Sequence, residues 1–84
     1  MKITFVVNGE EVHLTPDLAQ PLQEAVQEAL IRSQNSARPI SDWELRHENG
    51  VHIPDQSQWV GTYGFPEGVY LFLTLRVGAG GLSQ

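Results

Sequence analysis

The sequence contains no cysteine among its 84 residues. The chain therefore has no disulfide, no thiolate metal ligand and no cysteine that could act as a nucleophile or thioester acceptor. A chain without disulfides is compatible with the cytoplasm, which we take as the expected location. The apolar run at the N-terminus is too short for a signal peptide, and no run elsewhere approaches the length of a membrane span.

Basic residues are also scarce. Five Lys and Arg residues stand against ten Asp and Glu residues, which gives a formal net charge of −5. The five are spread along the chain: Lys2, Arg32, Arg38, Arg46 and Arg76. Because nucleic acids and anionic membranes bind basic patches, we expect neither as a partner. A basic protein partner fits this charge better.

The last sixteen residues join an apolar run to a glycine-rich end. From 69 to 77 the side chains alternate between two faces, which is the period of a central strand with one face buried. Gly78-Ala79-Gly80-Gly81 has almost no side chain to pack and permits extended conformations. With 40% hydrophobic residues, we expect one folded domain over residues 1–77 and a flexible tail over residues 78–84.

The first third of the chain predicts a hairpin and then a helix. Residues 2–7 and 10–14 alternate as strands, and Asn8-Gly9 between them suits a type I′ turn, in which both central residues have positive φ. A helix of about four turns should begin near Pro21 and run to about Gln34. Its apolar stripe consists of Leu22, Ala25, Val26, Ala29, Leu30 and Ser33.

The middle of the chain predicts a second hairpin. Residues 43–48 alternate as a third strand, Asn49-Gly50 forms the turn, and residues 51–53 form a short return strand that Pro54 stops. The connection over residues 55–68 contains three aromatic residues, Trp59, Tyr63 and Phe65. We expect this connection to fold back under the core and to form one helical turn.

These elements occur in the order ββ-α-ββ-β. A helix that crosses one face of a sheet between two hairpins is an α+β arrangement. The most apolar strand is the last one, so it should lie centrally, beside the first strand. The expected fold is a β-grasp with a mixed sheet of four to five strands and one crossover helix.

Taken in order, these segments resemble the ubiquitin-like protein modifiers over about residues 1–81. The chain is most similar to the bacterial ubiquitin-like proteins that are encoded with an activating enzyme, a conjugating enzyme and a JAB-type metalloprotease. The final segment carries one more small residue than the ubiquitin ending. The segments that carry the resemblance are Met1–Gly9, Leu22–Gln34, Trp43–Gly50, Leu71–Val77 and Gly80-Gly81.

The resemblance implies a modifier precursor rather than an enzyme, with no cofactor. A protease would cut between Gly81 and Leu82, an E1-like enzyme would activate the Gly81 carboxylate, and an E2-like enzyme would pass it to amines of target proteins as an isopeptide bond. Bacterial antiviral defence is a role that the resemblance also implies. Gly80, Gly81 and Leu82 are the processing and conjugation residues, and recognition of the tail would use Arg76, Val77, Gly78 and Ala79.

The solvent-facing side of the predicted sheet supplies a candidate interaction face. Arg46, Tyr70, Phe72 and Thr74 should point outward when Leu45 and its neighbours point inward. Two aromatic residues on a solvated face are typical of an interface, although scattered surface residues and an Arg46–Phe72 cation–π pair explain them as well. Ubiquitin has an aliphatic patch with a histidine in this place, so its receptors are not expected to bind.

The remaining reactive side chains give weaker signals. Lys2 is the single lysine, so polymers built through isopeptide bonds would have only Lys2 or the N-terminal amine as acceptor. The three histidines, His13, His47 and His52, fall on separate strands without the spacing of a metal site, and we expect no metal. No catalytic motif accompanies them.

Three functions remain open. The first is a conjugated modifier, and the second is a sulfur carrier that uses a C-terminal thiocarboxylate, against which the three residues after Gly81 count. The third is an adaptor that is never conjugated and acts through the sheet face alone, which predicts that loss of residues 78–84 leaves function intact. The glycine-rich end is also explained as an ordinary frayed terminus.

Overall fold

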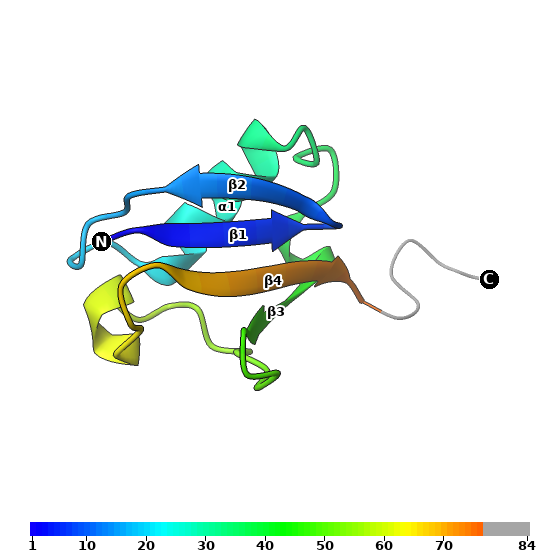
Figure 1. Cartoon of the computed structure of the whole chain (residues 1–84). Helices are drawn as coiled ribbons and strands as arrows, with labels where there is room; N and C mark the ends of the chain where they lie inside the picture. The colour runs from blue at the N-terminus through cyan, green and yellow to red at the C-terminus, as the bar shows by residue number, and fades with distance from the viewer. Residues whose placement is uncertain (77–84) are drawn as a thin grey trace.

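The computed structural model describes residues 1–76, in which a four-stranded sheet packs against one helix (Figure 1). The elements are β1 (Ile3–Val7), β2 (Glu10–Leu14), α1 (Leu22–Arg32), the 3₁₀ turn η1 (Ile40–Asp42), β3 (Trp43–His47), the 3₁₀ turn η2 (Val60–Tyr63) and β4 (Val69–Leu75). The predicted α+β class and the mixed sheet with one helix are confirmed. No helix in these residues has the length and apolar character needed to cross a bilayer.

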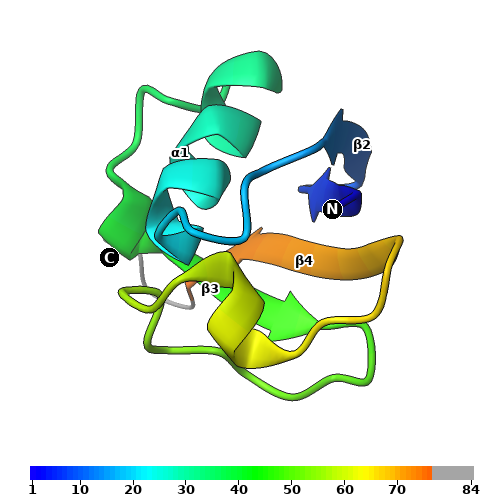
Figure 2. The same cartoon turned by 90° about the vertical axis from the view of Figure 1, so that its left-hand side faces the viewer.

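The strand that closes the fold lies in the middle of the sheet. The strand order is β2-β1-β4-β3, with β4 parallel to β1 and antiparallel to β3. The central position predicted for β4 is therefore confirmed. Figure 2 shows α1 covering one side of the sheet and leaving the other side open.

The core lies between α1 and the covered side of the sheet. Every second residue of β4 points into it, and the helix contributes the stripe that the sequence predicts. Burying one such aliphatic or aromatic side chain stabilises the fold by about 1.5–3 kcal/mol. The largest fully buried side chains include Trp43, Phe5, Ile3, Leu22, Leu30, Leu45, Leu71 and Leu73.

The two hairpin turns differ in geometry. Asn8 and Gly9 have φ values of 50° and 91°, as a type I′ turn requires. In the second turn only Gly50 is left-handed, with φ 90°. Gly50 N donates to His47 O at 2.8 Å and His47 N donates to Val51 O at 2.8 Å, which is a three-residue loop ending in a glycine.

The return strand predicted at residues 51–53 is reduced to a single bridge. His52 pairs with Arg46 there, and Ile53 N donates to Leu45 O at 2.8 Å before Pro54 removes the next donor. The sheet in residues 1–76 therefore has four strands, the lower of the two numbers expected.

The helix is shorter at both ends than expected. Pro21, with φ −58° and ψ 138°, precedes the helix instead of forming its first residue, and the last helical residue is Arg32. Gln34 adopts a left-handed φ of 63°, and its N–H donates to Ile31 O while Asn35 N donates to Leu30 O at 2.7 Å. This is a Schellman ending, which closes an eleven-residue helix of about three turns.

The long connection before β4 caps the start of α1. Leu22 N donates to Gln58 O and Gln23 N donates to Gln56 O, each at 2.9 Å, so two of the free N–H groups of the first turn are satisfied by backbone carbonyls. Val60 N and Gly61 N in turn donate to carbonyls of the segment before the helix. Residues 18–23 and 56–61 thus form a paired unit.

The aromatic residues of this connection divide into two groups. Tyr63 and Phe65 are partly buried against the core and stack with ring centroids 5.3 Å apart. The predicted helical turn is present as η2. The connection therefore folds back against the core as expected, whereas Trp59 is 54% exposed and does not take part. Trp59 lies in the segment that pairs with Pro21, and Val60, the next residue, enters the core instead.

Candidate functional site

The candidate interaction face lies on the open side of the sheet. Arg46 and Phe72 are direct cross-strand partners in β3 and β4, and Phe72 also faces Val6 of β1. Tyr70 is 40% exposed and Phe72 is 38% exposed. We call Arg46, Tyr70, Phe72 and Thr74 the outer face. All four residues lie on the solvent side of the sheet, as their alternation predicts.

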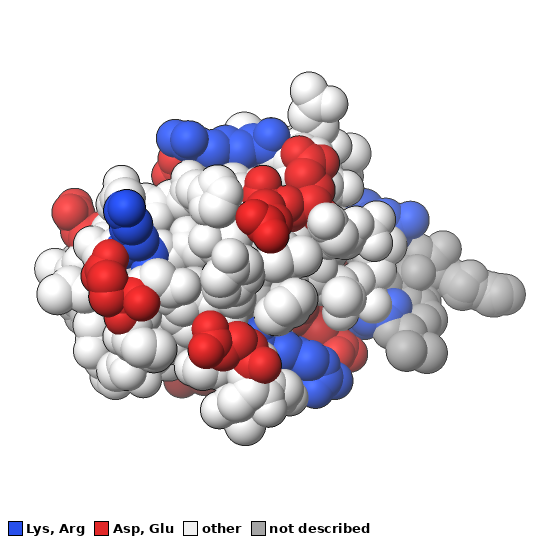
Figure 3. Space-filling view, in the orientation of Figure 1, with Lys and Arg blue, Asp and Glu red and all other residues white. Residues whose placement is uncertain are grey.

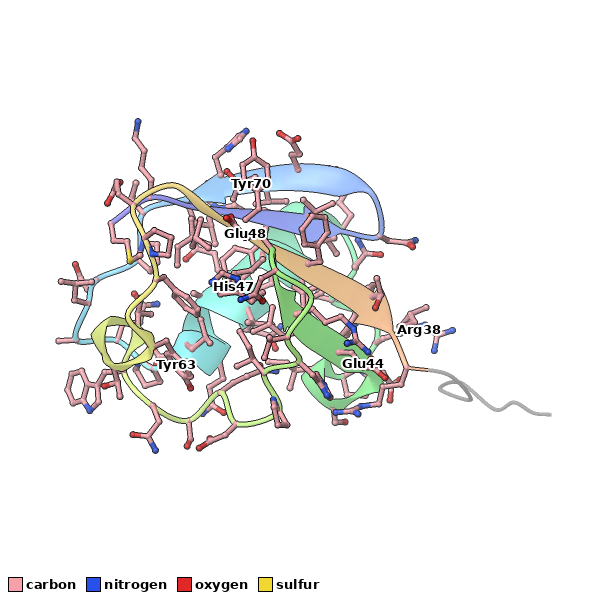
Figure 4. All side chains as sticks on the ribbon, turned by 60° about the horizontal axis from the view of Figure 1, so that its bottom comes forward. Arg38, Glu44, His47, Glu48, Tyr63 and Tyr70 are labelled. Atoms are coloured by element: carbon pink, nitrogen blue, oxygen red, sulfur yellow. The ribbon has the colours of Figure 1, made fainter. Side chains whose placement is uncertain are left out.

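Two acidic residues fix parts of the outer face. Glu48 Oε1 accepts the backbone N–H of Tyr70 at 2.8 Å, and Figure 4 shows Glu48 beside Tyr70. Arg46 donates from Nη2 to Glu44 Oε1 at 3.1 Å and from Nη1 to Gly50 O at 3.3 Å. The guanidinium group is therefore held by oxygen atoms of β3 and its turn. The cation–π pair with Phe72 is not among the ring contacts found in residues 1–76.

Acidic and basic side chains surround an uncharged centre on this side of the molecule. Figure 3 shows this centre as a mostly white surface, with red and blue groups around it. Val6, Tyr70 and Phe72 are contiguous there because Val6 pairs with Phe72, and Thr4 pairs with Tyr70. Such a surface can bind a partner through aromatic contacts at its centre and ion pairs at its rim.

The described chain ends beside η1. Arg76 N donates to Asp42 O at 2.8 Å, which continues the hydrogen bonding beyond the last residue of β4. Arg76 Nε donates to Ser41 O at 2.7 Å, and Asp42 forms an ion pair with Arg38 at 3.7 Å. Arg76, which the sequence assigned to tail recognition, is thus tied to the fold through both its backbone and its side chain.

The other tail residues of the prediction lie outside the described residues. They are Val77, Gly78, Ala79, Gly80, Gly81 and Leu82. The predicted boundary between a domain at 1–77 and a tail at 78–84 also falls there and stays a prediction.

The chain matches one protein family along almost its whole length. The family model described as "Protein of Unknown function (DUF2604)" matches residues 1–81. The chain belongs to the DUF2604 family. It is also similar to the uncharacterized protein y4jI of Sinorhizobium fredii, with 35% identity over 81 residues. That match covers 96% of this chain and 62% of the relative's length.

Solved structures similar to this DUF2604 chain carry the ubiquitin-like fold. The solution structure of the ubiquitin-like domain of Arabidopsis thaliana protein At2g32350 matches with a TM-score of 0.71 and 16% identity, over 89% of this chain and 76% of that one. A second structure of the same protein gives a TM-score of 0.69 at 16% identity, over 90% of this chain and 86% of that one. The ubiquitin-like fold expected from the sequence is thereby shown.

The possible acceptor lysine and the histidines lie apart from one another in the DUF2604 fold. Lys2 is exposed just before β1, and its backbone N–H donates to Glu67 Oε2 at 2.9 Å. His13 of β2 has its ring nitrogen Nδ1 3.0 Å from Thr4 Oγ1, and His47 of β3 packs against Phe65. No group of three potential metal ligands occurs within residues 1–76.

Sequence reasoning missed a hollow beside the end of β4. A space of about 330 Å³ lies between η1, the first turn of α1 and the connection after Pro54, with Trp43 and Arg76 among its lining residues. Its lining carries both polar and apolar groups, and it borders the place where the described chain ends. The hollow is formed by segments far apart along the sequence, so no local pattern could have indicated it.

Proposed function

We propose that this DUF2604 protein is the precursor of a ubiquitin-like modifier. A protease of the JAB type cuts after Gly81, an E1-like enzyme activates the new carboxylate, and an E2-like enzyme transfers it to amines of target proteins. The observation that carries the proposal is the sequence Gly78-Ala79-Gly80-Gly81, which follows the central strand of a ubiquitin-like fold after Arg76 and Val77.

The position of β4 supports this proposal physically. β4 pairs with β1 as far as Leu73 and with β3 as far as Leu75, so its last residues are held on the fold by β3. Arg76 is then anchored to Ser41 and Asp42. An enzyme that recognises the folded domain would therefore find the following glycines at a defined starting point. Glycines without side chains suit a narrow active-site channel.

The extent of the family match also supports the proposal. The family model matches residues 1–81, a region that includes Gly80 and Gly81. The relative in Sinorhizobium fredii is in line with a bacterial setting, for which we propose antiviral defence as the role. The chain itself is no enzyme in this account and needs no cofactor.

Attachment to other proteins is the direct test. An N-terminally tagged chain is expressed with the neighbouring genes of its own genome, beside two matched variants that end at Gly81 and at Val77. We expect tagged adducts from the full chain and from the variant ending at Gly81, with isopeptide bonds between Gly81 and lysine side chains in peptide mapping. The variant ending at Val77 should give none.

Two other results would contradict the modifier. A Gly81 thiocarboxylate without any protein adduct would assign the chain to the sulfur carriers. Equal adducts from the full chain and from both shortened variants would show that attachment does not involve the glycine end.

The outer face favours an adaptor as the second candidate. Tyr70 and Phe72 form an exposed aromatic centre that the core does not require. An adaptor predicts that proteins co-purified from cells are lost with Phe72→Ser and kept with the variant ending at Val77. A modifier predicts that covalently attached partners are lost with the variant ending at Val77.

A further inference from the structure

A second exposed apolar surface lies away from the outer face. Trp59 is 54% exposed and Leu18 is 57% exposed, and both belong to the paired unit of residues 18–23 and 56–61. Leu18 lies over Gly61, since a Cβ atom at Gly61 would be 3.3 Å from Leu18 Cβ. Tryptophan is highly buried on average, so an indole exposed to this degree indicates a contact surface.

The charged residues next to the paired unit in the sequence are all acidic, whereas the N-terminus lies at the same end of the molecule as η2. Asp17 and Glu24 flank the first segment of the paired unit, and Asp55 precedes the second. The sequence has no Lys or Arg between residues 3 and 31 or between 47 and 75. The ion pairs found in residues 1–76 use Glu11, Glu28, Asp42 and Glu44, so these three acids remain without a cationic partner among the described residues.

Asp55 accepts two hydrogen bonds from Ser57. Its Oδ1 accepts from the Ser57 hydroxyl at 2.6 Å and from the Ser57 backbone N–H at 3.0 Å, and these bonds hold the pKa of the carboxyl below its usual value. A carboxylate that stays ionised attracts a cation over the whole neutral range.

We propose that the Trp59 surface, made of Leu18 and Trp59 with the acids Asp17, Glu24 and Asp55, docks an arginine-rich segment of a partner protein. The indole face is the strongest aromatic acceptor for a guanidinium group. The uncompensated carboxylates supply the complementary charge, and Leu18 supplies apolar contact for the arginine methylenes. The arginine segment would therefore be attracted in two ways. The carboxylates act at long range and are sensitive to salt, and the indole of Trp59 acts at short range.

The position of this surface leaves the other end of the molecule free. Figure 1 places η2 near the N-terminus, at the opposite end of the sheet from the last residues of β4. Figure 4 shows Tyr63 of η2 at that end and Arg38 and Glu44 at the other. A partner in contact with η2 and Trp59 therefore lies away from the last residues of β4, whereas Asp55 also lines the hollow beside Arg76. The proposal is independent of the proposed conjugation and holds for an adaptor as well.

Peptide titration of the full chain tests the proposal. The probe is an arginine-rich nonapeptide, compared with a glutamate-rich nonapeptide of equal length, and binding is measured by calorimetry at two salt concentrations. A Trp43→Phe variant leaves Trp59 as the single tryptophan, so its fluorescence reports contact at that site. We expect saturable binding of the arginine peptide, a change in Trp59 emission and weaker binding at the higher salt concentration.

Matched variants locate the binding site. Trp59→Ala should weaken the arginine peptide by about tenfold, whereas Ile31→Ala, at an exposed residue of α1 with similar exposure, should leave the affinity unchanged. Thermal unfolding of both variants checks that the fold is intact. Equal affinity for the arginine and glutamate peptides, or an unchanged affinity in folded Trp59→Ala, would overturn the proposal.

Discussion

The hydroxyl group of Tyr63 joins two parts of the connection between β3 and β4. It donates to Asp55 O at 2.6 Å and accepts from Gln58 N at 3.3 Å, and Gln58 O in turn caps α1. Burial raises the pKa of the Tyr63 hydroxyl above its ordinary value. The stability from this shift is complete below the pKa of the unfolded tyrosine and is lost as pH rises through the higher folded value.

Tyr63→Phe should lower the free energy of unfolding by about 1 kcal/mol, because Asp55 O and Gln58 N lose a partner. Urea denaturation at neutral pH measures this change in the free energy of unfolding. The control is Tyr70→Phe on the outer face, which should stay within about 0.5 kcal/mol of the parent. The loss of stability at alkaline pH should also be smaller in Tyr63→Phe. Equal effects of the two substitutions would contradict this role of Tyr63.

At the scale of elements, local patterns predicted most of the fold. Alternation located β1, β2, β3 and β4, and the apolar stripe located α1, because both signals depend on neighbouring residues. The boundaries of α1 were wrong because distant groups determine them: Gln56 and Gln58 cap the start, and a left-handed Gln34 ends the helix. The outer face was predictable by alternation. The tie of Arg76 to η1 was not, because it joins segments far apart in the chain.

The Schellman ending of α1 gives a prediction about Gln34. A left-handed conformation disfavours any residue with a Cβ atom, so Gln34→Gly should raise the free energy of unfolding by about 0.5–1 kcal/mol. The matched control is Gln27→Gly inside α1, which should lower it by a similar amount. Chemical denaturation of the two variants checks both signs. Destabilisation by both would contradict the left-handed cap.

At the scale of the whole molecule, acceptor groups limit any self-attachment. Lys2 is the single lysine and is exposed at the end of the sheet near η2. If the chain is conjugated to itself through a side chain, Lys2→Arg should abolish those polymers and leave attachment to other proteins unchanged, because the charge is kept while the reactive amine is lost. Gel mobility and peptide mapping measure the polymers and the attachment to other proteins. Polymers that persist at the parent level would show that Lys2 is not the acceptor.

Charge and fold together describe a domain with separate surfaces. The outer face, the exposed Trp59 beside η2 and the end of β4 occupy different parts of one small fold, although Asp55 lines the hollow beside Arg76. From a net charge of −5 we expect basic protein surfaces, and not nucleic acid, as partners. In a conjugated modifier, separate surfaces would allow enzymes and receptors to bind without competing.

The intact mass of the chain, expressed with its native neighbouring genes, shows whether it is processed after Gly81 and joined to other proteins. A modifier precursor should give a species that lacks only Leu82, Ser83 and Gln84, together with heavier species in which Gly81 is joined to other proteins. An unaltered chain ending at Gln84, without heavier species, would contradict both the modifier and the sulfur carrier. The adaptor would then be the remaining function.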